Sequence, residues 1–149
     1  MFDDHSDKDK REQRDRLTQD YDTIVKESSV LTSAGGILFG FLLNISINPP
    51  EGFTLINRII LLVALFSIAI AVSLFVMPII YHHWRYPSKN LEKAKERSHR
   101  FMIFGLIPAG ITLYLSLEIA LSLTISRAVS FVLAAIPFLL VYILFRMRK

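Results

Sequence analysis

The sequence has no cysteine, and this absence removes a group of chemistries at once. Disulfide bonds, thiolate metal ligands and a cysteine nucleophile are all excluded. No catalytic triad, phosphate-binding loop or pair of neighbouring carboxylates is recognisable in the sequence either. We therefore predict that the chain is not an enzyme, with no catalytic residue, no cofactor and no metal site.

Charged residues are scarce over most of the chain, although they make up 20% of it, against 52% hydrophobic residues. They crowd into residues 1–27, 82–100 and 146–149. A small soluble domain interleaves the two kinds, because each helix needs a polar face toward water. The net charge of +4 comes from basic residues beside apolar runs, which is typical of membrane topology signals. We predict no nucleic-acid partner.

Four runs of the sequence are apolar for long enough to cross a bilayer: residues 29–47, 59–81, 101–124 and 128–145. The hydrocarbon core is about 30 Å thick and needs about 20 apolar residues as a helix. Because the runs are continuously apolar rather than alternating, helices are favoured over the strands of a membrane barrel. We predict an all-α fold, a four-helix transmembrane bundle over residues 29–145, surrounded by the lipid bilayer.

Lysine and arginine are nearly absent from one side of this predicted bundle. Of the 17 Lys and Arg residues, all but Arg58 and Arg127 lie in the three charged segments. Cytoplasmic flanks carry the excess of Lys and Arg in membrane proteins. The distribution predicts a multi-pass protein of the cell (inner) membrane with cytoplasmic N- and C-termini. Residues 82–100 then form a cytoplasmic loop, and 146–149 form a cytoplasmic tail.

Residues 1–28 are predicted to form an amphipathic cytoplasmic helix ahead of the first span. Its apolar face, at helical spacing, consists of Leu17, Tyr21, Ile24 and Ser28. The segment has a net charge of −3, whereas residues 82–100 have a net charge of +4. Two interpretations are open: a solvated extension of the first span, or a docking element that meets the basic loop.

Small and polar residues recur at helical spacing inside two of the spans. Such residues let helix backbones approach closely in a membrane. Three interpretations are open: packing within one copy of the chain, an interface between subunits, or the lining of a pore. The residues are Thr32, Gly36, Gly40 and Asn44 in the first span, with Gly105 and Ala109 in the third.

Glu118 is the one acidic residue within a predicted span. An ionisable group inside a membrane is a functional candidate by default. Glu118 falls about 25 Å along the third span at about 1.5 Å per residue, near its outer end. Arg58 and Arg127 begin their spans at the same level. Three interpretations are open: a structural ion pair with one of these arginines, exposure to solvent, or a proton or cation site.

Aromatic, histidine and arginine residues border the cytoplasmic ends of the second and third spans. They suit the headgroup level of a bilayer, where amphipathic rings and basic side chains are favoured. The histidines alone are too weak a signal to predict a metal site. We predict interfacial or lipid-contacting roles for His82, His83, Trp84, Arg85 and Arg100.

Several short segments carry a resemblance to a known family. They are residues 37–43, Asn57 with Arg58, Met77 with Pro78, Tyr81 with His82, and Arg85, His99 and Arg100. Over about residues 27–105 the chain resembles a family of small bacterial and archaeal membrane proteins filed as a domain of unknown function. The resemblance implies four helices and an inner-membrane location. Some members carry an automatic label of sodium:proton antiporter.

Two functions follow from these observations. The first is a non-enzymatic multi-pass membrane protein that permits ion permeation or transport as a homo-oligomer, because one copy has too few polar residues in its spans to line a path. The alternative is a structural or accessory protein that binds a partner or an anionic lipid through the basic loop over residues 82–100.

Overall fold

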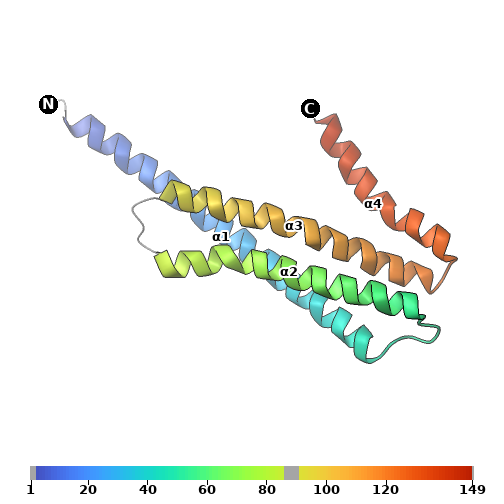
Figure 1. Cartoon of the computed structure of the whole chain (residues 1–149). Coiled ribbons are helices and arrows are strands. Elements are labelled where there is room, and N and C mark those ends of the chain that lie inside the picture. Colours follow the sequence, from blue (N-terminus) through green and yellow to red (C-terminus); the bar gives the residue numbers. More distant parts are fainter. Residues whose placement is uncertain (1–2, 86–90, 149) are drawn as a thin grey trace. The chain divides into compact units, whose positions relative to one another are not determined.

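The computed structural model describes residues 3–85 and 91–148, and within these ranges the chain is a series of α-helices joined by turns (Figure 1). The helices are α1 (Asp3–Ile47), α2 (Leu55–Arg85), α3 (Leu91–Ser122) and α4 (Arg127–Met147). Each contains a stretch long and apolar enough to cross a membrane. The prediction of an all-α fold with four such helices is therefore confirmed.

The local sequence accounts for where the helices begin and end. Pro49 lacks the N–H that a helix would need, and α1 ends two residues earlier, at Ile47. Gly52 makes the turn before α2 with a φ of 81°, a conformation that other residues rarely adopt. α4 begins after Ser126, whose extended backbone directs its carbonyl to accept a hydrogen bond from the Ser130 N–H at 3.0 Å.

The predicted loop over residues 82–100 is largely helical, which corrects its boundaries. α2 and α3 extend into it from both sides, so only residues 86–90 fall between them, and these lie outside the described residues. The part inside α3 contains neither glycine nor proline, so nothing interrupts the helix. Glu96 and Arg100, one turn apart, form an ion pair at 2.7 Å that supports this helix by a few tenths of a kcal/mol.

α1 is one uninterrupted helix of 45 residues. The predicted helix over residues 1–28 and the first predicted span are therefore parts of the same element. On the predicted face, Tyr21, Ile24 and Ser28 are buried and Leu17 is half-buried. The N-terminal part of α1 thus packs against other helices of the chain over at least two turns.

The chain divides into two compact units, and α1, α2 and α3 contribute to both. The first unit comprises Met1–Gly36 with Ala71–Leu106. The second unit comprises Ile37–Ile70 with Ile107–Lys149, so all of α4 belongs to it. Each unit has its own buried interior.

The first unit packs α1 against the second half of α2 and the first half of α3. Its buried apolar side chains include Tyr21, Ile24, Ala71, Phe75, Ala94 and Met102. Ser28 is fully buried and donates a hydrogen bond to the Phe75 carbonyl of α2. Pro78, nearly one turn later, removes a backbone donor from α2. Side-chain hydroxyls commonly help to satisfy the backbone near such prolines in apolar helices.

The second unit combines the end of α1, the first half of α2, the second half of α3 and α4. Its buried apolar side chains include Leu42, Leu61, Ala64, Leu65, Ile68, Ile119 and Ala134. Polar side chains are buried among them, namely Asn57, Thr112, Glu118 and Ser130. The second unit therefore encloses an ionisable group, Glu118, and several neutral polar side chains among apolar ones.

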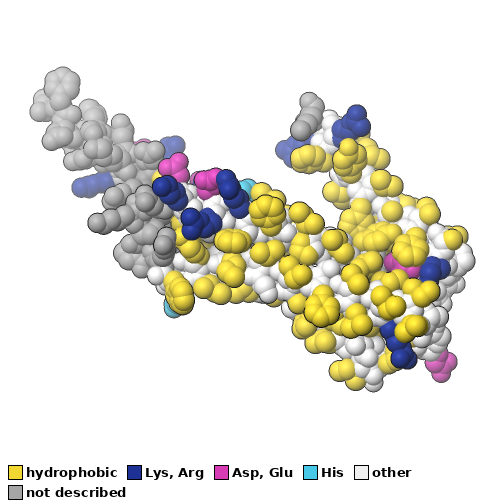
Figure 2. Space-filling model, viewed as in Figure 1, with side chains coloured by type: hydrophobic (Ala, Val, Ile, Leu, Met, Phe, Trp, Pro, Cys, Tyr) yellow, Lys and Arg dark blue, Asp and Glu magenta, His cyan; other side chains and the backbone are white. Residues whose placement is uncertain are grey.

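The outside of the helices is apolar as well. Figure 2 shows hydrophobic side chains over the visible face of the helices, with Lys and Arg gathered in a few places. Phe66 is 70% exposed and Phe145 is 69% exposed. Soluble proteins rarely expose contiguous apolar patches larger than a few hundred Å². Lipid tails remove the cost of this surface, so the four helices indicate a membrane protein.

Candidate functional site

Hydrogen bonds between α2 and α3 set the level at which Glu118 lies. The Thr112 hydroxyl lies 3.2 Å from the Ala64 carbonyl of α2 and 2.9 Å from the Pro108 carbonyl of its own helix. Glu118 follows Thr112 by six residues, or about 9 Å, and Asn57 precedes Ala64 by seven, or about 10 Å. Glu118 of α3 and Asn57 of α2 therefore share a level.

Contacts between α3 and α4 bring Arg127 to the same level. The Tyr114 hydroxyl donates a hydrogen bond to the Phe131 carbonyl at 3.3 Å. The Tyr114 ring also meets Phe138 edge-on, with ring centroids 6.0 Å apart. Glu118 lies one turn after Tyr114, and Arg127 lies one turn before Phe131. Because residues four apart share a helix face, Glu118 lies on the face of α3 that carries Tyr114.

Glu118 is fully buried and lacks a partner. Its exposed fraction is 0%, and neither carboxyl oxygen has a hydrogen-bond partner among the described residues. The interpretation that Glu118 is exposed to solvent is therefore wrong. Leaving a buried polar group unpaired costs about 1–3 kcal/mol, and more when the group is charged. The burial of Glu118 without a hydrogen-bond partner is therefore unfavourable, which makes Glu118 a candidate functional residue.

Arg127 bonds to neutral side chains instead of to Glu118. Its guanidinium donates hydrogen bonds to the Asn57 amide oxygen and, at 3.1 Å, to the Thr54 hydroxyl. We call Thr54, Asn57, Glu118 and Arg127 the polar layer. The ion pair between Arg127 and Glu118, one of the three interpretations left open by the sequence, is not formed among the described residues. Asn57 competes for the guanidinium because it is itself buried and needs a donor.

Arg58 is not part of the polar layer. It is exposed and lines a hollow of about 360 Å³ between the end of α1, the following turn and the start of α2. Apolar side chains, including Ile47, Phe53 and Leu61, form most of the remaining lining. No ion pair joins Arg58 to Glu118 within the described residues. The alternative pair predicted from the sequence is therefore also not formed.

Helix ends of both signs lie near the polar layer. α2 begins at Leu55 and α4 at Arg127, whereas α3 ends at Ser122, one turn after Glu118, so positive and negative dipole ends both reach this level. The Arg127 guanidinium adds a full positive charge. Among the described residues, no cluster of three His, Cys, Asp or Glu residues that could hold a metal ion occurs.

The sequence named Asn57 only among the segments that carry the family resemblance and did not name Thr54 at all, although both bond Arg127. Asn57 begins a buried face of α2 that continues through Leu61, Ala64 and Ile68 at helical spacing. An amide on the buried face of an apolar helix was the signal that would have found it. Thr54 precedes α2 and has no such periodic signal.

The small-residue series of α1 has open space beside its glycines. A Cβ atom added at Gly36 or at Gly40 would meet nothing within 4 Å. The Thr32 hydroxyl bonds its own helix at the Ser28 carbonyl, at 2.8 Å. Asn44 is exposed and accepts a hydrogen bond from Asn48 at 3.2 Å. Among the described residues no atom contacts the space beside these two glycines, so the three interpretations stay open there.

The corresponding residues of α3 behave differently. Gly105 is buried, and a Cβ atom there would lie 2.6 Å from a ring carbon of Phe75 and 3.3 Å from the Leu74 side chain. Ala109 is half-buried. The absence of a side chain at Gly105 therefore allows α2 and α3 to approach closely in the first unit.

The predicted interfacial residues lie on the ends of α2 and α3. His83 is exposed, and Trp84 is 86% exposed. His82 and Arg85 belong to α2, but their side chains lie outside the described residues. Arg100 is exposed on α3 and bonds Glu96. The described positions His83, Trp84 and Arg100 are compatible with headgroup contact.

Comparison with known proteins identifies a family. Neither the curated proteins nor the solved structures contain a match to the chain. A family model described as "Family of unknown function (DUF6328)" matches residues 9–148. The match extends through α3 and α4, beyond the segments that carried the resemblance in the sequence. The chain therefore belongs to this family of unknown function.

Proposed function

We propose that the protein crosses the cell (inner) membrane four times, with both termini on the cytoplasmic side. Four apolar helices and the concentration of Lys and Arg in the terminal segments and around residues 86–90 support this topology. The N-terminal part of α1 then forms a cytoplasmic extension of the first span. A reporter fused in the turn at Ser126 should read as external, and a cytoplasmic signal there would overturn the topology.

Within this topology we propose that the protein moves protons across the membrane, with Glu118 as the group that carries them. The observation behind the proposal is the complete burial of Glu118 without a partner among the described residues. An unpaired carboxylate in an apolar interior is costly, and a bound proton removes the charge and most of that cost. Intramembrane acids in this condition are typical of proton relays.

A proton fits the polar layer better than a metal cation does. The Arg127 guanidinium, a full positive charge in the polar layer, opposes the entry of a metal ion. The Asn57 amide oxygen is a neutral group that could bind a metal ion, but it already accepts a hydrogen bond from Arg127. A proton needs no further ligands, because it binds covalently to the carboxyl oxygen.

The proposed transport requires more than one copy of the chain. The buried polar side chains described in the second unit, namely Asn57, Thr112, Glu118 and Ser130, are too few to form a continuous polar path. A continuous polar path therefore needs further groups from a second copy. The open faces at Gly36 and Gly40 are compatible with close approach by another helix. We propose a homo-oligomer on these grounds.

Proton flux into proteoliposomes tests the transport proposal. Purified full-length protein is reconstituted with a pH-sensitive dye inside the vesicles, and a potassium gradient with valinomycin drives proton entry. We expect Glu118→Gln to reduce the protein-dependent flux to the level of empty vesicles. Glu51→Gln is the matched control, because Glu51 is exposed in the turn before α2 and should keep full flux. Unchanged flux in Glu118→Gln would exclude Glu118 as the carrier.

A second function is supported by a separate observation in the first unit. Lys93, Arg97 and Arg100 line a hollow of about 350 Å³ on α3. This basic surface favours an accessory role in which the protein binds an anionic lipid or an acidic partner. The two functions occupy different units and are compatible with each other.

A further inference from the structure

We infer that the basic hollow on α3 binds the phosphate group of an anionic lipid headgroup. The inference deepens the proposed accessory function and rests on it, because it names the ligand class and the residues that hold it. We call Lys93, Arg97 and Arg100 the basic triplet. Glu96 completes the lining of the hollow.

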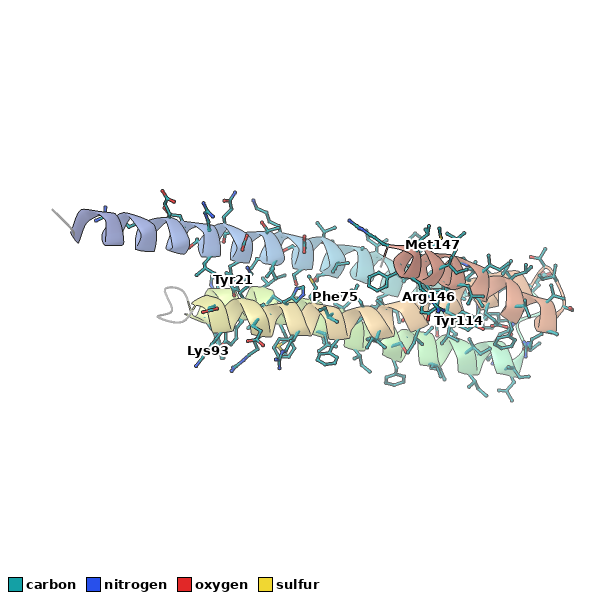
Figure 3. All side chains as sticks on the ribbon, turned by 90° about the horizontal axis from the view of Figure 1, so that it is seen from above. Tyr21, Phe75, Lys93, Tyr114, Arg146 and Met147 are labelled. Atoms are coloured by element: carbon teal, nitrogen blue, oxygen red, sulfur yellow. The ribbon has the colours of Figure 1, made fainter. Side chains whose placement is uncertain are left out.

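The basic triplet lies on one face of α3. Its members are four and three residues apart, which places their side chains on the same side of a helix. Ala94 and Ser98, which alternate with them, are buried. Figure 3 shows Lys93 on the side of α3 that faces away from α1. Three cations therefore converge on one exposed hollow instead of being spread around the helix.

Contacts with neighbouring side chains hold two of these cations in place. The Arg97 guanidinium lies 5.9 Å from the centroid of the Tyr81 ring, within the range of a cation–π contact. Arg100 donates to Glu96 at 2.7 Å, which uses part of its five N–H groups and leaves the others available. Guanidinium groups fixed in this way match the oxygens of a phosphate with two parallel hydrogen bonds.

Lys95 is separate from this arrangement although it belongs to the same stretch of α3. It forms an ion pair with Asp20 of α1 at 2.6 Å. Its charge is therefore balanced within the first unit, whereas the basic triplet and Glu96 together leave two positive charges unbalanced. A headgroup with about two negative charges, such as a phosphate monoester at neutral pH, neutralises the hollow.

An apolar surface follows the basic triplet and indicates that the phosphate belongs to a lipid. Ile103 and Phe104 lie three and four residues after Arg100, on the same side of α3. They are 46% and 59% exposed. A phosphate held by the basic triplet would place acyl chains along these side chains. A free phosphate ion would make no use of them.

The test uses Trp84, the single tryptophan of the chain, as a reporter near the end of α2. Full-length protein is placed in nanodiscs of phosphatidylcholine that contain a small fraction of brominated phosphatidic acid. Bromine quenches tryptophan fluorescence at short range, so quenching beyond that of brominated phosphatidylcholine measures enrichment of the anionic lipid. We expect brominated phosphatidic acid to be enriched around the wild-type protein. Phosphatidylglycerol, which carries a single charge, should be enriched less.

Two double variants with equal loss of charge separate a built site from general attraction. Lys93→Gln with Arg97→Gln should lower the relative affinity for phosphatidic acid about tenfold or more. Arg146→Gln with Arg148→Gln removes two charges from the end of α4 and should leave the affinity within a factor of about two. An equal loss in both variants would overturn the basic triplet as a site. The single variant Lys93→Gln changes an exposed residue, so it should fold even if the double variant does not. It should lower the affinity for phosphatidic acid by a smaller factor.

A soluble competitor distinguishes the lipid from free phosphate. Inorganic phosphate or glycerol phosphate at equal concentration should fail to displace the brominated lipid. Displacement by either would overturn the assignment to a lipid. Absence of any enrichment of an anionic lipid would overturn both the inference and the lipid-binding form of the accessory function. Enrichment that survives loss of the basic triplet would overturn the inference alone.

Discussion

The basic triplet of the first unit and the polar layer of the second unit use similar residues in opposite settings. On α3, Arg97 and Arg100 are exposed, and the charges near them are paired or open to an external ligand. In the polar layer, Glu118 has no exposed surface and Arg127 is partly buried. Exposed pairs contribute about 0–1 kcal/mol because water screens them, whereas buried groups cost several kcal/mol when unpaired. Changes in the buried polar layer should therefore affect stability more than changes in the exposed pairs near the basic triplet.

The largest effect should come from Asn57→Leu, which removes the buried acceptor of Arg127. We expect a loss of about 2–3 kcal/mol of unfolding free energy, because a hydrogen bond to a charged group is lost and the charge remains partly buried. Thermal unfolding in detergent, followed by circular dichroism, measures it. Asn48→Leu is the matched control, since Asn48 is exposed beyond the end of α1 and its loss should be small. Equal losses would show that the polar layer adds nothing specific.

The next largest change in unfolding free energy should come from the close contact between α2 and α3 in the first unit. Gly105→Ala should destabilise the protein by about 1–3 kcal/mol, because the new Cβ atom would collide with the buried Phe75 ring. Gly36→Ala has open space and gains helix propensity, so the monomer should be unchanged or stabilised by up to about 1 kcal/mol. The same unfolding measurement applies to both. A reversed order would contradict the close packing of α2 on α3.

Glu118→Gln should have a smaller effect on stability. Because a bound proton already removes the charge of Glu118, a neutral Gln should change the unfolding free energy by less than about 1 kcal/mol, although we expect proton flux to be lost. A loss of 2 kcal/mol or more would show instead that Glu118 is paired with Arg127 in the membrane. The measurement thus separates a carrier group from a structural ion pair.

The smallest effect should come from Lys95→Gln, which breaks the exposed pair with Asp20. We expect less than about 0.5 kcal/mol, because both side chains are partly exposed and screened by solvent. The difference from the wild-type protein should shrink further when salt is raised from 0.05 to about 1 M. A loss as large as that of Asn57→Leu would remove the contrast between the two regions.

Much of the fold was predictable because it depends on local composition. Long apolar runs specify membrane-length helices whatever surrounds them, and Pro49 with Gly52 separates the first two. The buried face of α1 at Tyr21, Ile24 and Ser28 also followed from spacing alone. The loop over residues 82–100 was predicted too long, because it was bounded by the ends of the apolar runs, although charged side chains are good helix formers in water.

The site was predictable only in part. The sequence identified Glu118 as the one acid within a span and placed Arg127 at its level, because rise per residue fixes height along a helix. It did not determine which face Glu118 uses or which acceptor Arg127 chooses. Gly36 and Gly105 show the same limit, because two glycines in similar contexts proved to be open in one case and closely packed in the other.

The sequence by itself determined four membrane-length helices, the side on which basic residues gather, and the presence of one acid among apolar residues. The tertiary structure decided that this acid is fully enclosed, that Arg127 bonds Asn57 and Thr54, and that three cations of α3 share one hollow. Hydropathy and helix rise are properties of each segment alone. Burial and partner choice depend on which faces of different helices meet, and this is set by packing between residues distant in the chain.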